Sequence, residues 1–375
     1  MTEHPEQQNL KSEVDYNASD DSTAASMMFD KAVWHGFCEI ESEPALFNVM
    51  LRDWGVKGVK VQEVVSLDRE MLGFLQYTVN CACASVALLN IINNIDDVDI
   101  GEQLHHFKAF TMEFTPALRG DAISNFKFVK QVHNSFARRM DILNADLQLK
   151  NDSTVKKSKA SKRNQSFDES EAGFHFIAFV PANGKVWKFD GLERQPQSLG
   201  NYIGEDWLEL ARPEIQSRMA EYEEDQIEFS ILSLVRDPII EIVNQLALNV
   251  KSLITIDEQL SNCPTLSGLD CLDDGTVTGP DLSLNLTQSI LEKAAVPEDD
   301  LQRYKTISRD CLLSLRKALV DAQKAIRASI KEEQQSCEAD NNYADKRRHD
   351  YGPAVQRWLQ LLARKGLIEY VATEE

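Results

Sequence analysis

One apolar stretch does most to limit the folds open to this chain. Residues 82–94 read Ala-Cys-Ala-Ser-Val-Ala-Leu-Leu-Asn-Ile-Ile-Asn-Asn, and their spacing predicts a helix that is apolar almost all round. A helix of this kind is stable only when other elements cover it. We therefore expect it to be buried in the core of a domain.

The segments on either side of this helix alternate between helical and strand patterns. Pro44 is suited to begin a helix with an apolar stripe, and Gly55 is placed to end it. Asn183-Gly184 separates two apolar runs and is a strong signal for a β-hairpin. Further helices are predicted near 121–147 and 213–224, and strands near 59–65, 174–180, 185–189 and 227–235. The mixture predicts an α/β or α+β domain.

The second half of the chain has a different character. A helix is predicted from Pro238 to about Leu260, followed by an acidic stretch, a long amphipathic helix from 301 to about 333 and a last helix near 353–365. We predict a disordered acidic tail at 1–30, the α+β domain at 31–236, a helix and acidic linker at 237–300, and a helical module at 301–375, separate from the α+β domain.

Composition excludes several functional classes. Sixty acidic residues against forty basic ones give a net charge of −20, which disfavours direct nucleic-acid binding and favours basic partners. No apolar run approaches the roughly 18 residues that a membrane span needs, so no membrane association is expected. The cysteines and histidines lack metal-ligand spacing and no glycine-rich phosphate loop occurs, so we expect no metal or cofactor.

Three side chains along the chain suggest thiol chemistry. Cys83 is at the mouth of the apolar helix, where the helix dipole favours the thiolate. His175 is inside an apolar strand, and Asp190 follows at the end of the next strand. A cysteine between alanines is usually a small core residue, and a lone histidine in a strand is usually structural. The order Cys, His, Asp is nevertheless that of papain-like thiol hydrolases.

Several motifs together resemble the ubiquitin C-terminal hydrolase family of thiol deubiquitinases. Trp34 to Pro44 is similar to the family's opening W-x-x-I-E-S-x-P, 61–67 to V-x-E-[VI]-x-S-L, and 80–85 to the nucleophile motif N-x-A-C-A-[TS]. Residues 118–125 and 132–138 resemble the helices that lead into the family's crossover loop, and 174–176, 181–184 and 189–192 its catalytic hairpin. The resemblance covers about 31–236 and implies a papain-like α+β domain with an antiparallel-rich sheet flanked by helices.

The resemblance implies a role for each candidate residue. Cys83 is the nucleophile, His175 the general base and Asp190 the carboxylate that orients the imidazole. Cys81 is a rival thiol, but it occupies a variable position of the motif. The family's oxyanion glutamine stands six residues before the nucleophile, whereas here Gln76 stands seven before it and Tyr77 six. Either side chain could donate to the oxyanion.

The chain also departs from the family's pattern. The segment from Ser66 to Leu75 runs almost directly into Gln76, so an inner strand of the sheet is expected to be missing. Loss of that strand would open backbone hydrogen-bonding edges. A ubiquitin-binding scaffold with impaired catalysis is therefore one alternative to an active deubiquitinase. An unrelated Cys-His-Asp acyl transferase is a second, independent alternative.

The C-terminal residues extend the resemblance to the long-tailed branch of the family. Residues 346–351 (Lys-Arg-Arg-His-Asp-Tyr) and the Trp/Leu helix after them look like the tail of its proteasome-associated and chromatin-associated members. Ubiquitin conjugates and a helical adaptor of one such complex are the implied partners, with cytoplasm and nucleus as the expected location. The lysine-rich loop at 150–171 is either a crossover gate or a nuclear-import patch.

Overall fold

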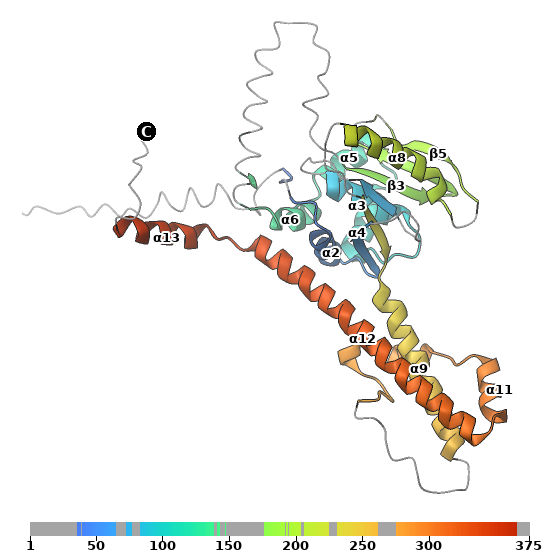
Figure 1. The fold of residues 1–375 in the computed structure, drawn as a ribbon. Coiled ribbons are helices and arrows are strands. Elements are labelled where there is room, and N and C mark those ends of the chain that lie inside the picture. The colour runs from blue at the N-terminus through green and yellow to red at the C-terminus, as the bar shows by residue number, and fades with distance from the viewer. Residues whose placement is uncertain are drawn as a thin grey trace, which may run out of the picture.

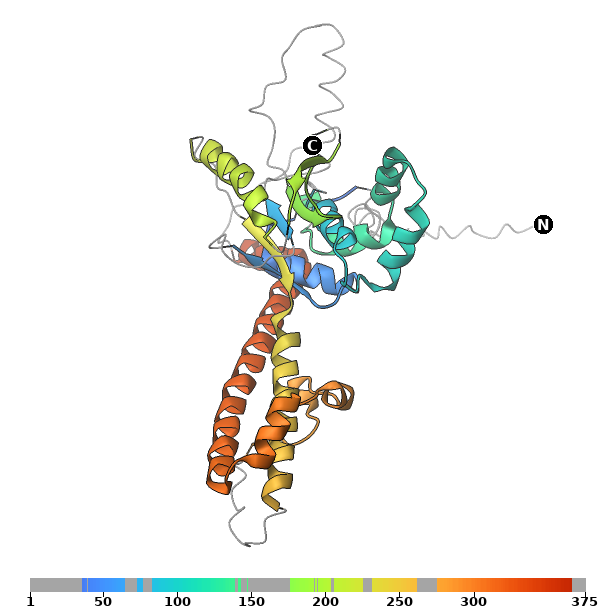
Figure 2. The same ribbon diagram turned by 90° about the vertical axis from the view of Figure 1, so that its right-hand side faces the viewer.

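A computed structural model describes most of the chain between residues 36 and 365 (Figure 1). The description omits residues 39, 65–72, 77–82, 139–140, 143–146, 148–175, 192, 194, 204–205, 225–230 and 262–274. The described part forms an α+β domain, from which a pair of long helices projects (Figures 1 and 2). This arrangement confirms the predicted fold class.

The α+β domain is built on a six-stranded sheet with the order β1-β6-β2-β3-β4-β5. All neighbouring strands are antiparallel. The strands are β1 (Val59–Glu63), β2 (Gly73–Gln76), β3 (Ile177–Ala182), β4 (Lys185–Asp190), β5 (Gln197–Asn201) and β6 (Ile231–Arg236). The predicted hairpin joins β3 to β4, and Asn183 and Gly184 both have positive φ, as a two-residue hairpin turn requires.

The prediction of a missing inner strand is wrong. β2 lies between β6 and β3, and its four residues pair with β6 while the last three also pair with β3. Gly73 is opposite Leu234, and Gln76 is opposite Ile231 on one side and Ile177 on the other. A strand this short can occupy the inner position, because the ladders on both sides supply hydrogen-bond partners for its backbone.

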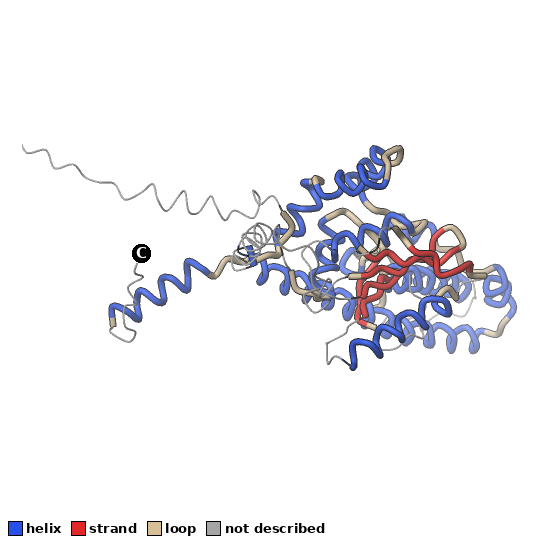
Figure 3. Tube along the Cα trace, turned by 90° about the horizontal axis from the view of Figure 1, so that it is seen from above, coloured by secondary structure: helices blue, strands red, loops and turns tan. Residues whose placement is uncertain are grey.

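Helices cover both faces of the sheet (Figure 3). Helix α3 (Cys83–Asn94) packs under one face, and Leu88, Ile91 and Ile92 are fully buried there. This confirms the buried apolar helix. The opposite face is covered by α8 (Leu208–Glu224), whose Ala211 and Ile215 pack on Ile177 and Phe179 of β3. The remaining helices of the domain are α2 (Pro44–Asp53), α4 (Gly101–Thr111), α5 (Pro116–Ser124) and α6 (Lys127–Ser135).

The single helix predicted at 121–147 is two helices. Thr115 caps α5 by accepting a hydrogen bond from the Leu118 backbone N–H. The helix ends at Ser124, and α6 begins two residues after Asn125. The Asn125 amide bonds back to the Asp121 carbonyl, an arrangement that competes with helix continuation.

The second half of the chain is helical, as predicted, but its helices are divided differently. Its elements are α9 (Pro238–Ser261), a 3-10 turn at Leu282–Leu284, α10 (Gln288–Lys293), α11 (Glu298–Thr306), α12 (Arg309–Arg348) and α13 (Gly352–Arg364). The predicted helix from 301 to 333 breaks where Ser308 caps α12, which then continues for 40 residues. α9 and α12 run side by side as the projecting pair (Figures 1 and 2).

Helix α9 corrects the expectation that no apolar run approaches the length of a membrane span, since it alone among the described residues has that length and apolar composition. Its apolar character has a local explanation. Val243, Leu246 and Val250 are buried in a cluster with Ile330 of α12 and Leu291 of α10. The apolar side chains of α9 thus form the core of the helical pair.

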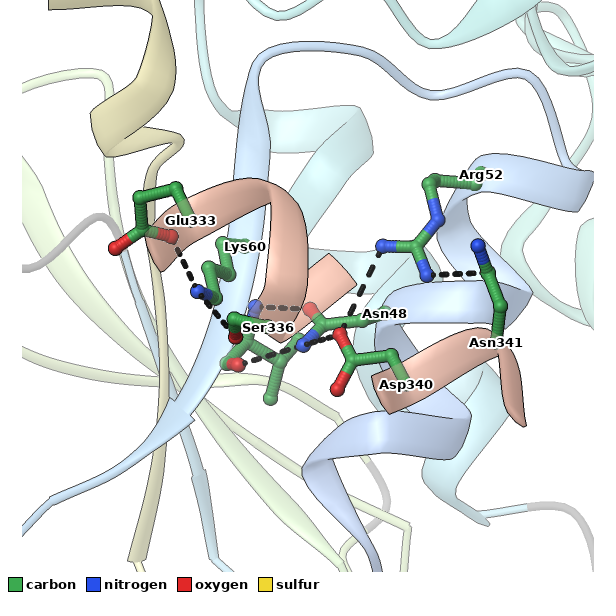
Figure 4. A network of polar contacts seen from close by, with 8 residues as sticks. Asn48, Arg52, Lys60, Glu333, Ser336, Asp340 and Asn341 are labelled. Atoms are coloured by element: carbon green, nitrogen blue, oxygen red, sulfur yellow. Dashed lines mark hydrogen bonds and ion pairs between the residues drawn. The ribbon is translucent and has the colours of Figure 1, made fainter. Parts of the chain in front are cut away.

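The last third of α12 returns to the α+β domain and lies on α2 (Figure 4). Lys60 pairs with Glu333 at 2.7 Å, and Asp340 accepts a hydrogen bond from Asn48 at 3.1 Å. The expectation that the helical module stands apart is therefore not met for this part of the helix, although the predicted domain boundaries stay predictions. Burial raises the pKa of Asp340, and the nearby Arg52 guanidinium opposes that shift.

The basic residues at the end of α12 take part in the same contact. Arg347 is almost fully buried and lies 3.2 Å from Glu41 and 3.3 Å from Asp141. Arg348 pairs with Asp53 at the end of α2. These ion pairs therefore hold the end of α12 against the α+β domain.

One amide side chain connects three elements at this contact. Asn48 of α2 is buried, and its carboxamide accepts from the Val61 N–H at 2.6 Å and donates to the Val61 carbonyl at 3.1 Å. β1 is at the end of the sheet order, so Asn48 takes the place of a further strand at that edge. The same amide also holds Asp340 of α12.

We predict that Asn48→Ala lowers the free energy of unfolding by about 2–4 kcal/mol, because it leaves two buried backbone groups of Val61 unsatisfied. Asn341→Ala is the matched control. Asn341 belongs to the same network but accepts a hydrogen bond from Arg52 at an exposed position, so its loss should cost under about 1 kcal/mol. Equilibrium unfolding in denaturant measures both. Equal losses would contradict the role assigned to Asn48.

Candidate active site

The predicted nucleophile stands at the start of the buried helix. Cys83 is the first residue of α3, directly after the undescribed segment 77–82, which includes the rival Cys81. The first backbone N–H groups of a helix have no partners within it and carry the positive end of its dipole. The expectation of a thiolate at Cys83 rests on this position in the helix and stays a prediction.

A chain of buried polar groups anchors the first turn of α3. Ser85, two residues after Cys83, lies 2.7 Å through its hydroxyl oxygen from Nδ1 of His133 on α6. The other ring nitrogen of His133, Nε2, lies 2.8 Å from the Cys38 carbonyl oxygen. Because a carbonyl can only accept, Nε2 carries a proton, and in the neutral imidazole Nδ1 accepts a hydrogen bond from the Ser85 hydroxyl.

Asn134, the residue after His133, binds the segment from Gly36 to Cys38. The Cys38 N–H donates to Oδ1 of Asn134 at 3.0 Å, and the Asn134 amide nitrogen donates to the Gly36 carbonyl at 2.9 Å. Cys38, His133 and Asn134 are all buried. Two motifs that the sequence presents only as resemblances thus meet at the start of α3. The sequence signal that could have revealed this role is that His133 and Asn134 are adjacent polar residues on the buried side of the amphipathic helix α6.

The sheet register places two further candidates, Gln76 and Asp190, opposite the same residue of β3. Ile177 of β3 is paired on one side with Gln76, the last residue of β2, and on the other with Asp190, the last residue of β4. His175 is outside the described residues, two positions before Ile177 in the sequence. α3 packs against both β2 and β3. Helix α3 therefore contacts the strand that ends in Gln76 and the strand that follows His175, whereas Ile177 and Asp190 lie on the face that α8 covers.

Asp190 has an ion-pair partner that the sequence reading missed. Its side chain is only 6% exposed, and Oδ2 lies 3.4 Å from Nη2 of Arg218 on α8. Arg218 in turn lies 3.7 Å from Glu214, one turn earlier on the same helix. Nothing in the sequence marks Arg218, because its proximity to Asp190 depends on how α8 crosses the sheet.

Glu214 is also held by a buried lysine. Lys188 is two residues before Asp190 on β4, and its ammonium group donates to Glu214 at 2.8 Å. This hydrogen bond lowers the pKa of Glu214 below its usual value of 4.5. Because the folded-state pKa is lowered, the pair adds stability above about pH 4.5 and loses that contribution as the pH falls through the folded-state pKa.

Other segments named in the sequence analysis are outside the described residues. These are the acidic tail at 1–30, the rival oxyanion donor Tyr77 and the loop at 150–171. Within the described part of the chain, no three His, Cys, Asp or Glu side chains are grouped as a metal site would require. The catalytic roles of Cys83, His175, Asp190 and Gln76 therefore stay predictions.

Comparison with known proteins identifies relatives of the α+β domain. The family model described as "Ubiquitin carboxyl-terminal hydrolase, family 1" matches residues 37–80 and 71–220. Ubiquitin carboxyl-terminal hydrolase isozyme L5 of Dictyostelium discoideum is 28% identical over 295 residues, which are 69% of this chain and 81% of that protein. Ubiquitin carboxyl-terminal hydrolase ubh-4 of Caenorhabditis elegans is 32% identical over 241 residues, which are 56% of this chain and 68% of that protein.

Solved structures were compared too. The Trichinella spiralis UCH37 catalytic domain bound to ubiquitin vinyl methyl ester is 29% identical, with a TM-score of 0.42, and the match covers 54% of this chain and 95% of that one. Trichinella spiralis UCH37 bound to the same ubiquitin derivative is 22% identical with a TM-score of 0.43, and the match covers 77% of this chain and 99% of that one.

We predict that His133→Leu lowers the free energy of unfolding by about 2–4 kcal/mol, because it leaves the Ser85 hydroxyl and the Cys38 carbonyl buried without their imidazole partner. His106→Leu is the matched control, since His106 is exposed on α4 and its loss should change stability by at most about 0.5 kcal/mol. Chemical unfolding followed by fluorescence measures both. A His133 variant as stable as the control would show that the chain of polar groups does not anchor α3.

Proposed function

Because this chain belongs to ubiquitin carboxyl-terminal hydrolase family 1, a family of cysteine peptidases, we propose that it cleaves the bond after the C-terminal glycine of ubiquitin. The observation that carries the proposal is that α3, which Cys83 begins, packs against β2, which ends in Gln76, and β3, which follows His175. Papain-like chemistry needs a nucleophile at a helix start and its base on an adjacent strand.

The proposed reaction uses the three predicted side chains in sequence. The Cys83 thiolate attacks the carbonyl carbon of the ubiquitin glycine, while the imidazolium of His175 balances its charge. His175 then gives its proton to the leaving amine, and a thioester remains. Water, deprotonated by His175, hydrolyses the thioester and releases Cys83. Asp190 keeps the imidazole in one orientation throughout.

The developing oxyanion needs hydrogen-bond donors in this scheme. Gln76 ends β2, the strand next to β3, and we assign the donor role to its amide. Removal of one such donor typically lowers the rate by about 10²–10³. Tyr77 remains the rival donor.

The scaffold alternative has lost one of its two supports. It depended on an absent inner strand and on the shifted glutamine, and β2 occupies the inner position. The register shift of Gln76 relative to Cys83 is the remaining observation that favours a protein with impaired turnover.

We predict that Cys83→Ala abolishes hydrolysis of a fluorogenic ubiquitin C-terminal amide, because no other thiol begins α3. Cys81→Ala is the matched control and should retain most of the wild-type kcat/KM. Labelling with a ubiquitin C-terminal vinyl electrophile, followed by peptide mapping, should place the adduct on Cys83. An adduct on Cys81 would reverse the assignment of the nucleophile, and binding without any adduct would favour the scaffold.

We also propose that the C-terminal helix recruits the enzyme to a larger complex through a helical adaptor, on the proteasome or in a chromatin assembly. Helix α13 carries four exposed apolar side chains, Val355, Trp358, Leu359 and Leu361. None of its described residues is buried. An amphipathic helix with an uncovered apolar face is the kind of element that inserts into the groove of a helical partner.

We predict that Trp358→Ala with Leu359→Ala removes co-purification with that complex but leaves hydrolysis of the small ubiquitin substrate within about twofold of wild type. Gln356→Ala with Gln360→Ala, on the same helix, is the control and should still co-purify. These point changes spare the part of α12 that packs on α2. Retained co-purification of the Trp358/Leu359 variant would contradict recruitment through α13.

Two expectations from the sequence are carried forward as part of the proposal. The loop at 150–171 is assigned to limit the size of the leaving group, with nuclear import as the alternative use of its lysines. The assigned location is the cytoplasm and the nucleus, where ubiquitin conjugates and their complexes are found.

A further inference from the structure

Asp190 is a buried carboxylate with a cationic neighbour. Its side chain is 6% exposed, and a charge at that depth is stable only when it is paired and hydrogen-bonded. Nη2 of Arg218 supplies one such contact to Oδ2. The guanidinium is planar and permanently charged, so it can fix the direction of a carboxylate as well as balance its charge.

Arg218 is held in place from its other side. Its Nε lies 3.7 Å from Glu214, and Glu214 accepts a hydrogen bond from Lys188 at 2.8 Å. Lys188 and Asp190 are two residues apart on β4 and so share one face of the strand. Both face α8, which carries Glu214 and Arg218. The four charges therefore alternate in sign between a strand and a helix.

We propose that Arg218 is a positioning residue for catalysis, which acts by fixing the carboxylate of Asp190. The inference rests on the proposed function, in which Asp190 orients the imidazole of His175. With Oδ2 held by Arg218, rotation of the carboxylate about its Cβ–Cγ bond is restricted, and Oδ1 keeps one direction. A fixed Oδ1 holds the imidazole in the tautomer and orientation that the proton transfers require.

The arrangement explains why a lysine is buried beside the site. Lys188 is 5% exposed, which is unusual for a lysine without a specific partner. Its bond to Glu214 fixes the carboxylate on which the Arg218 guanidinium rests. β4 therefore carries both Asp190 and Lys188, and Lys188 helps to hold Arg218 in place through Glu214.

The test compares Arg218→Met with Arg218→Lys in the full-length chain. We expect Arg218→Met to lower kcat about tenfold, as loss of a charge-assisted hydrogen bond does, with KM within twofold of wild type. Arg218→Lys retains the cation and should recover at least a third of the wild-type kcat. Arg52→Met is the matched control. It removes an arginine of α2 that pairs with Asp340 of α12, outside the proposed site, and it should leave kcat unchanged.

A second readout does not depend on ubiquitin. The alkylation rate of Cys83 by iodoacetamide at neutral pH, followed by peptide mapping, reports how well the imidazole supports the thiolate. We expect this rate to fall about tenfold in Arg218→Met and to be unchanged in Arg52→Met.

The two readouts separate failure of this inference from failure of the proposed function. An Arg218→Met variant whose Cys83 is alkylated at the wild-type rate overturns the positioning role, whether or not the chain hydrolyses ubiquitin amides. Equal losses in Arg218→Met and Arg218→Lys that track a lower unfolding midpoint also overturn it, because they indicate a structural ion pair. A slower alkylation of Cys83 in a chain that does not hydrolyse ubiquitin amides supports the inference and rejects the proposed function.

Discussion

The burial of α3 is the constraint on which the rest of the structure depends. Its apolar side chains require cover on several sides, and the sheet, α2 and α6 all contribute residues to the cluster around it. Burial also fixes the start of the helix, where Ser85 is bonded to His133. The residue that begins this helix is therefore held by the hydrophobic core itself, and the proposed chemistry needs no separate scaffold for its nucleophile.

Local sequence signals predicted the elements that depend on local physics. Pro44 begins α2, Gly55 follows its end with positive φ, and Asn183-Gly184 makes the hairpin turn, because each relies on backbone preferences of the residue itself. The inner strand was misjudged since four residues of ordinary composition become a strand only when two neighbours supply hydrogen bonds. The split between α5 and α6 was missed for a similar reason, as a side-chain bond at Asn125 outweighs the apolar period.

The residues of the candidate site also differ in whether the sequence could reveal them. Cys83 and Asp190 were assigned through the resemblance to a family's motifs, and their predicted places at the start of a helix and the end of a strand are those of the structure, while their catalytic roles stay predictions. Arg218 could not be chosen, because an arginine on a polar helix looks solvated until the crossing of α8 over β4 is known. The same holds for the end of α12, where the sequence pattern does not show that Arg347 and Arg348 lie against the α+β domain.

The return of α12 to α2 has a consequence for how the chain is synthesised. The last strand, β6, ends at residue 236, whereas α12 ends at residue 348, so 112 residues (348 − 236) separate the completed sheet from its last covering helix. At 5–20 residues per second, a ribosome needs roughly 6–22 s to add them. During that interval every strand of the sheet has been synthesised, while the α2 surface that receives α12 still lacks its cover. Until α12 is made, this surface stays open to chaperones and to aggregation.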